Sequence, residues 1–386
     1  MTLEEILAMP EVERKIYYLK KGRKTEQPNA HALYNDWNPN KHEIVIDEEK
    51  YPKIKITTQP EKRITDPKTG KEYIEPAVKK EVDPNRIALP IEQDIVNIQT
   101  AFTVGTEPIL DCQPDQPEET LLSALKQVFK KNKLKYQNKK VVRAWLAEQE
   151  VAEYWYVVRD DGFWAKLKRK ISGIFGKSKP EYRLKSAIWS PFRGDKLYPF
   201  FNDQGDLVAL SREYKKKDLN DVEITCFMTI TKDMVYQWEL TSSWSDKGSF
   251  AHGFKKMPVI YMYRPEAYCE KIKSLRVRLE KLLSSYADCI DYHFFPILML
   301  FGNVENFSGE FKNRVVELTG QGANAQYLTW SQVPDTVKFE VETLLSQIYG
   351  LTNTPRISFD SLKGTGNAVS GVSFDYVFMS THTTVH

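Results

Sequence analysis

The chain has 386 residues, more than one hydrophobic core usually serves, so we expect at least two packing units. Hydrophobic residues make up 41% and charged residues 28%, a balance that excludes wholesale disorder and is typical of a folded soluble protein. The formal net charge is only +3. A protein that holds nucleic acid tightly through phosphates usually carries a larger positive excess, so any such contact should be local or loose.

Cysteine usage and the N-terminal sequence indicate a cytosolic setting. The four cysteines show neither a Cys-x-x-Cys motif nor a histidine at zinc spacing, so we expect free thiols and no metal site. They are Cys112, Cys226, Cys269 and Cys289. Residues 1–20 are acidic and broken by Pro10, unlike a signal peptide. The longest apolar run, 294–301, is far shorter than the ~20 residues of a membrane-spanning helix. We expect the protein to stay in the cytosol, or inside an assembly formed there.

The N-terminal region predicts one helix followed by short strands. Apolar residues recur at helical spacing over 2–21. The segment 24–41 is irregular, whereas apolar and charged residues alternate over 43–51 and 53–58, which predicts strands. The sequence DPKTG at 66–70 is a turn signal, because proline presets φ and glycine accepts positive φ, so strands should flank it.

The middle of the chain predicts helices and then a sheet. Helical spacing marks 85–105, 118–134 and 139–153. Strand patterns follow at 154–159, 183–189, 207–214, 223–230 and 234–240. The sequence DQGD at 203–206 predicts a hairpin turn between two of these strands.

A basic segment at 163–180 interrupts the predicted sheet, with aromatic and aliphatic residues among lysines and one arginine. One interpretation is an amphipathic helix that lies on an anionic membrane surface. The other is an insertion helix that packs on its own domain and turns its lysines to water. The two glycines of the segment weaken a helix and favour the second interpretation.

A long amphipathic helix, leading into a short apolar strand, organises the C-terminal half at 265–302. Its apolar stripe comprises Ile272, Leu275, Leu279, Leu282, Tyr286 and Ile290. The opposite face carries a row of cations, Lys271, Lys273, Arg276, Arg278 and Lys281. Pro296 ends the helix, 297–301 reads as a strand, and a second helix follows at 336–350.

Two clusters of suggestive residues do not predict catalytic chemistry. Gly364 and Gly366 invite a phosphate-binding interpretation, but the sequence lacks the third glycine of a dinucleotide fingerprint and the Gly-Lys-Ser/Thr of a Walker motif. A flexible exposed loop before a helix at 371–379 fits them better. Asp288, Asp291 and His293 have the spacing of no standard metal site, and solvation of a helix end explains them. We find no catalytic triad or paired acid and base, and we expect no enzyme.

Four patches follow one another at 85–109, 252–261, 282–302 and 344–371. They comprise a helix with a Gly-x-x-Pro-Ile exit, a strand containing Met-Pro-Val-Ile, a long helix running into Phe-Pro-Ile-Leu, and a helix followed by a glycine-flanked loop. In order and spacing, they resemble the portal proteins of tailed bacteriophages, in the branch found in siphophages of Gram-positive hosts. The basic segment 163–180 has no counterpart in that pattern.

The resemblance implies an α+β, portal-like fold with a mixed wing domain, two long stem helices, a small α/β clip and a tunnel loop with its helix. It implies an N-terminal arm and wing strands at 1–84, the wing at 85–264, the first stem helix at 265–293, the clip at 294–335, the second stem helix at 336–352, the tunnel loop at 353–371 and the start of a tunnel helix at 372–386. Relatives continue into a helical crown, so we expect that the crown is absent or the chain shortened.

The function implied by the resemblance is a ring of identical subunits, usually about twelve, at one vertex of the capsid. DNA would enter and leave through its channel without sequence-specific contacts. The implied partners are the terminase large subunit, a head–tail adaptor, the major capsid and scaffolding proteins, and double-stranded DNA. No cofactor is implied. The protein would belong to the virion and assemble in the cytoplasm of a host bacterium.

The resemblance also assigns candidate site residues. The DNA-facing tunnel loop would include Arg356, Lys363, Gly364, Gly366 and Asn367. The stem channel would be lined by the cationic row, Lys271, Lys273, Arg276, Arg278 and Lys281. Partner contacts at the clip would include Phe307, Phe311 and Trp330, although the same aromatic residues could form the clip core.

Two other classes of function compete with this interpretation. A peripheral membrane-associated scaffold would depend on the basic segment 163–180 alone. A non-catalytic subunit of a DNA-processing complex is the other alternative; a nuclease itself would need a carboxylate cluster for two metal ions, which the sequence does not show.

Overall fold

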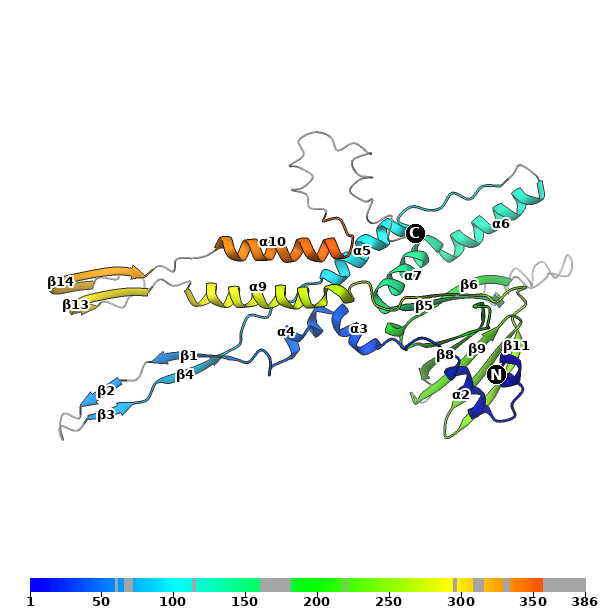
Figure 1. The fold of residues 1–386 in the computed structure, drawn as a ribbon, viewed down its shortest axis with the longest axis horizontal. Helices are drawn as coiled ribbons and strands as arrows, with labels where there is room; N and C mark the ends of the chain where they lie inside the picture. The colour runs from blue at the N-terminus through cyan, green and yellow to red at the C-terminus, as the bar shows by residue number, and fades with distance from the viewer. Residues whose placement is uncertain are drawn as a thin grey trace, which may run out of the picture. The chain divides into compact units, whose positions relative to one another are not determined.

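The computed structural model describes residues 1–59, 62–65, 72–112, 116–159, 182–217, 219, 221–293, 297–307, 316–328 and 334–356. Within them the chain is a mixture of helices and antiparallel strands, which confirms the α+β class (Figure 1). The basic segment 163–180 and the helix expected at 371–379 lie outside the described residues.

Two compact units divide the chain, in agreement with its length. Unit 1 comprises Met1–Asn38, Pro90–Lys271 and Tyr349–His386. Unit 2 comprises Pro39–Leu89 and Ile272–Ile348. Each unit is therefore built from segments that are far apart in the sequence. The division into wing, stem, clip and tunnel loop stays a prediction.

The N-terminus of unit 1 forms two helices where the sequence predicted one. Helix α1 spans Leu3–Leu7 and α2 spans Val12–Lys21. Pro10 lies between them, and a proline inside a helix removes a hydrogen-bond donor and clashes with the preceding turn, so the single helix over 2–21 is wrong. The buried side chains of both helices pack against Phe227 and Trp238 of the neighbouring sheet.

That sheet has five antiparallel strands in the order β11-β10-β9-β8-β7. The strands are β7 (Lys196–Phe201), β8 (Leu207–Lys217), β9 (Glu223–Thr231), β10 (Met234–Leu240) and β11 (Trp244–Ala251). The sequence pattern predicted three of them and missed β7 and β11. The predicted turn is present, but it joins β8 to β7, which was not predicted, rather than to another predicted strand. Gly205 has the positive φ of 89° that this turn requires.

A second, three-stranded sheet has the order β12-β5-β6. It contains β5 (Glu150–Arg159), β6 (Tyr182–Trp189) and β12 (Val259–Tyr263). A shared core joins the two sheets: Ala152 and Trp189 of the smaller sheet pack with Leu210 and Ile230 of the larger one.

Further α-helices of unit 1 are α3 (Ala30–Trp37), α5 (Ile91–Val104), α6 (Gln116–Asn132) and α7 (Leu134–Glu148). Helix α3 falls in the segment expected to be irregular. Helix α5 begins after Pro90 rather than at 85, because the residues before it are extended. The third predicted helix ends at Glu148, and Gln149, with a φ of 69°, turns the chain into β5.

Unit 2 contains hairpins, the whole of one long helix and the larger part of another. Its hairpins pair β1 (Ile54–Gln59) with β4 (Val78–Val82), β2 (Lys62–Thr65) with β3 (Glu72–Glu75), and β13 (Ile297–Phe307) with β14 (Val316–Leu328). The long helices are α9 (Lys273–His293), preceded by a short 3-10 turn at Glu270–Ile272, and α10 (Pro334–Leu351). Strands flank the predicted turn at 66–70. The strand predicted over 43–51 is wrong, because α4 (Glu43–Ile46) is a short helix there.

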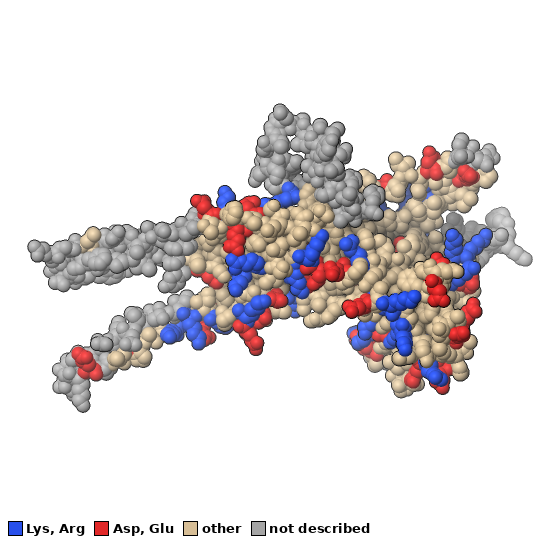
Figure 2. Space-filling view, viewed as in Figure 1, with Lys and Arg blue, Asp and Glu red and all other residues tan. Residues whose placement is uncertain are grey.

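Charged side chains of both signs are interspersed over the face shown in Figure 2. In the part of the chain that the structure describes, no helix combines the length and the apolar character that crossing a membrane requires.

Candidate functional site

Helix α9 buries a face that is partly polar. The buried side chains of the helix are Arg276, Leu279, Glu280 and Ser284, and Ile272, just before it, is buried as well. Each is three or four residues from another member, so they lie on one face. Arg276 was expected in the exposed cationic row, and that expectation is wrong. Its side chain is only 2% exposed, and its Nη1 atom pairs with Glu280 Oε2 at 3.2 Å. A guanidinium can be buried when a carboxylate compensates its charge.

Glu280 collects hydrogen bonds from three parts of unit 2. Its Oε1 atom lies 2.6 Å from His42 Nδ1 and accepts the backbone N–H of Leu89 at 2.9 Å, while Oε2 accepts the bond from Arg276. The side chains of Glu280 and His42 are both buried. Buried charges are stable only when they are paired and hydrogen-bonded, so this carboxylate joins the start of unit 2 to the middle of α9.

The extended segment 85–89 is bound along α9 at every second residue. The backbone N–H groups of Asn85, Ile87 and Leu89 donate to side chains that are four residues apart on the helix. These acceptors are Asp288 at 2.7 Å, Ser284 at 2.9 Å and Glu280 at 2.9 Å. The spacing matches, because two extended residues advance about 6.6 Å and four helical residues about 6.0 Å. The segment therefore reinforces α9 from one side.

The exposed face of α9 retains three cations of the predicted row, Lys271 just before the helix, Arg278 and Lys281. Lys273 is half-buried. Arg278 Nη2 forms an ion pair of 2.6 Å with Glu340 Oε1 of α10, and the two helices run side by side (Figure 1). Such an exposed pair contributes little to stability but fixes which faces of the helices meet.

The segment that follows α10 begins from a firmly held base in unit 1. Gln99 Nε2, on α5, donates to Thr354 Oγ1 at 2.9 Å, and the Tyr268 hydroxyl donates to the Thr352 carbonyl at 2.5 Å. The side chains of Thr352 and Thr354 are buried. Tyr349 donates its hydroxyl to an Asp94 carboxylate oxygen at 2.6 Å. Burial, followed by this bond, raises the pKa of Tyr349.

Two buried carboxylates of unit 1 have raised pKa values, but the fold itself supplies their partners. Burial raises the pKa of Glu148 to about 7, against the opposing effect of a 2.7 Å hydrogen bond from the Phe192 N–H. Burial also raises the pKa of Glu150, which accepts from Arg23 at 2.7 Å and from Tyr261 at 2.8 Å. Among the described residues, no three His, Cys, Asp or Glu side chains gather closely enough to hold a metal ion.

The candidate stem thus has a buried polar network, an exposed cationic face and a partner helix, and the chain beyond it starts from a fixed base. A family model described as "Phage portal protein, SPP1 Gp6-like" matches residues 40–386. The chain belongs to this family of phage portal proteins. No curated protein matches it. The match confirms the resemblance seen in the sequence, and membership makes the protein a structural component of a tailed bacteriophage.

The remaining site residues predicted for this portal protein are placed only in part. Arg356 is exposed and follows the held base after α10, whereas the other four tunnel-loop candidates, Lys363, Gly364, Gly366 and Asn367, lie outside the described residues. Phe307 ends β13, and the other clip candidates, Phe311 and Trp330, also lie outside them. The roles of all these residues stay predictions.

Sequence reasoning missed the network around Glu280 because its members come from separate parts of this portal protein. His42 is 238 residues away and Leu89 is 191 residues away. One local signal was available: Pro84 and Pro90 bracket the segment 85–89, and a residue before proline is biased toward extended backbone. That signal predicts an extended segment but not the helix to which it binds.

Proposed function

We propose that this portal protein assembles into a closed ring of identical subunits at one capsid vertex and forms the channel through which DNA enters and leaves the head. The family match carries the proposal, because it spans both long helices and the segment after α10. A head-to-tail contact that closes into a ring leaves no free interface on any subunit.

The charge distribution supports a channel in which DNA slides. The exposed face of α9 carries Arg278 and Lys281, with Lys271 exposed just before the helix, and Arg278 is already paired with Glu340. Each phosphate contact that releases counterions strengthens binding, so a lining with many free cations would hold DNA in place. A net charge of +3 and a sparse cationic face favour passage over tight binding.

The same proposal includes partners and places of contact. We assign the region 294–335, which contains the β13–β14 hairpin, to docking of the terminase large subunit and later of a head–tail adaptor. The wing would contact the major capsid and scaffolding proteins. Assembly would take place in the cytoplasm of the host bacterium, and the protein would act without a cofactor.

Native mass spectrometry combined with negative-stain imaging tests the ring directly. We expect closed rings of about twelve subunits with a central hole, at a mass that does not change over a concentration series. A species that stays monomeric up to the highest concentration used for imaging, both in the purified protein and in extracts of infected cells, would overturn the proposal.

The tunnel loop needs a separate functional test. The loop flanked by Gly364 and Gly366 would touch passing DNA through Lys363 and Asn367. Replacing both with Ala should slow DNA packaging in a reconstituted head, whereas the same change at Lys255 and Lys256, two exposed lysines of unit 1, should not. If the unmodified protein and both double variants packaged DNA equally well, Lys363 and Asn367 would not be DNA contacts.

A further inference from the structure

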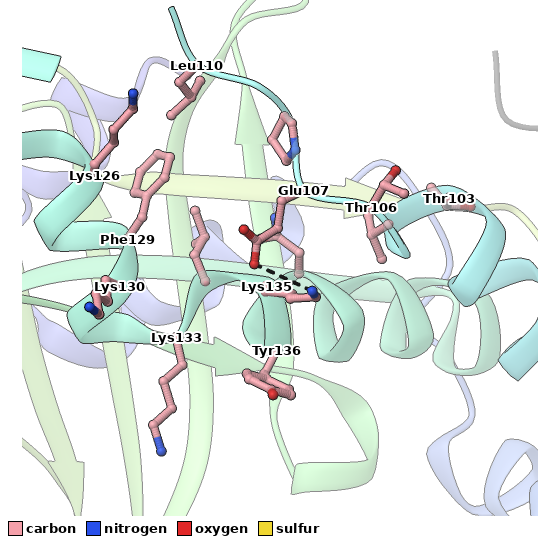
Figure 3. Close-up of a pocket in the computed structure, with 14 residues that line it drawn as sticks. Thr103, Thr106, Glu107, Leu110, Lys126, Phe129, Lys130, Lys133, Lys135 and Tyr136 are labelled. Atoms are coloured by element: carbon pink, nitrogen blue, oxygen red, sulfur yellow. Dashed lines mark ion pairs between the residues drawn. The ribbon is translucent and has the colours of Figure 1, made fainter. Parts of the chain in front are cut away.

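A groove with an apolar floor and a basic rim lies in unit 1 where α6 meets α7 (Figure 3). Its volume is about 940 Å³, large enough for several side chains of another chain. The apolar part of its lining is formed by Val104, Pro108, Leu110, Phe129, Leu134 and Tyr136. The lining also includes four lysines, Lys126, Lys130, Lys133 and Lys135, and a single acidic residue, Glu107.

The corner between the two helices sets the position of the rim. Lys133 adopts the left-handed conformation, with φ 52° and ψ 48°, and turns the chain between α6 and α7. Asn132, just before it, donates to the Val128 carbonyl of α6 and to the Leu184 carbonyl of β6. The end of α6, which carries Lys126 and Lys130, is therefore anchored to the sheet.

The positive charge of the rim is only partly compensated. Glu107 lies 3.7 Å from Lys135, and both side chains are largely exposed. Within the described residues, Lys126, Lys130 and Lys133 form no ion pair. Unpaired lysines around an apolar floor match a ligand that carries both carboxylates and apolar groups.

Exposed apolar side chains also lie on the two segments that line the groove, α6 and the chain before it. Leu121 and Leu125, one turn apart on α6, are 70% and 42% exposed, and Ile109 on the preceding segment is 96% exposed. A helix normally turns such a stripe toward a core, and contiguous exposed apolar surface in a soluble protein marks an interaction site. The charged DNA backbone would not bury these apolar side chains, so they favour a protein partner.

We propose that this groove, with the adjoining face of α6, docks an acidic amphipathic segment of another protein of the phage head. Apolar side chains of the segment would enter between Phe129 and Leu134. Its carboxylates would face Lys126, Lys130 and Lys133, giving electrostatic steering and fixed orientation. The inference rests on the proposed function in one respect: the partner is expected to be a head protein because this chain is proposed to work in the head.

Site-specific photo-crosslinking in infected cells tests the docking. A photoreactive phenylalanine analogue replaces Tyr136, a groove residue that is 62% exposed, and in a matched control it replaces Tyr17 on α2, which is 58% exposed. We expect a crosslink at position 136, absent at position 17, to a peptide of another head protein that has more Asp and Glu than Lys and Arg and carries aliphatic or aromatic residues. Crosslinking to a second copy of this chain, to DNA, or to no partner above the control would overturn the proposal.

Charge reversal of the groove lysines provides a second test of the docking. Lys126→Glu with Lys130→Glu should lower the yield of the crosslink at position 136 at least tenfold, while Lys255→Glu with Lys256→Glu, the same change of net charge elsewhere in unit 1, should leave it within twofold. An equal yield from both double variants would contradict the charge complementarity. Native mass spectrometry on the same proteins reports ring assembly separately, so loss of rings and loss of docking are distinguishable.

Discussion

The side-chain amide of Gln99 donates a 2.9 Å hydrogen bond to the Thr354 hydroxyl, across 255 residues of sequence. Gln99 also lies 3.3 Å from the Asn353 carbonyl, so one buried amide holds the chain where it leaves α10. Whatever the segment after 356 does in the assembled head, its starting point is set by α5. The anchor is therefore part of the support of the expected tunnel loop.

Replacing Gln99 with Ala should destabilise unit 1 by about 2 kcal/mol, because buried hydrogen-bonding groups at Thr352–Thr354 lose their donor. Denaturant unfolding of the variant measures this change. The matched control is Gln204→Ala in the exposed β7–β8 turn, which should change the free energy of unfolding by less than about 0.5 kcal/mol. Equal effects of the two substitutions would show that the Gln99 amide is not an anchor.

Removal of the Glu280 carboxylate should be among the most damaging single changes in unit 2. Glu280→Ala takes away the charge that pairs with buried Arg276, and breaking a buried pair typically costs about 3–5 kcal/mol. Glu280→Gln keeps an acceptor for the Leu89 N–H and should cost less. Glu340→Ala, which breaks the exposed pair with Arg278, serves as the control and should cost about 1 kcal/mol or less. A small effect at Glu280, measured by hydrogen exchange of α9 amides, would refute the network.

Stability should fall as pH rises through the titration range of Glu148. Its pKa is about 7 in the folded chain against the ordinary 4.5, so the folded state holds the proton more tightly than the unfolded state. The contribution of this residue is full below pH 4.5 and is lost progressively up to pH 7, by about 3 kcal/mol. Glu148→Gln keeps an acceptor for the Phe192 N–H and should remove this part of the pH dependence. Identical pH profiles of unfolding free energy for both proteins would contradict it.

The exposed face of α9 can be tested for a role in the channel. If Lys281 lines it, Lys281→Glu should slow DNA packaging several-fold and change its salt dependence, because a repulsive charge would then face the phosphates. Lys79→Glu, on exposed strand β4 of the same unit, gives the matched control. Both variants should fold with unchanged stability, as surface substitutions usually do. If both variants package equally well, another surface must line the channel.

Periodicity predicted the long elements well, because a stripe repeated over many residues leaves little ambiguity. Leu279 was placed on the buried face of α9, and it is buried. The start of the helix was set too early: Tyr268 is held by the Leu146 carbonyl and by Thr352, so the chain becomes helical only later. The prediction of short elements failed because a short pattern is ambiguous. Ile44 and Ile46 alternate like strand residues, and four residues are too few to distinguish a strand from one helical turn.

The site was less predictable than the fold, because side-chain roles depend on partners that the sequence does not reveal. Arg276 was assigned to the exposed row by its charge, and only Glu280, one turn away and buried with it, explains its true position. The groove between α6 and α7 was missed entirely. The positive φ of Lys133, which the sequence did not predict, turns the chain between the helices where lysines and apolar residues line the groove together.

The binding of 85–89 along α9 makes this short stretch intolerant of changes in length. Successive N–H groups of an extended chain point to opposite sides, so inserting or deleting one residue between Asn85 and Leu89 would turn one or more of the three donors away from the helix. Substitution is easier, because Ile87 and Leu89 contribute their backbone N–H to these bonds rather than their side chains. Among portal chains that use the same arrangement, this stretch should therefore vary in sequence while keeping its residue count.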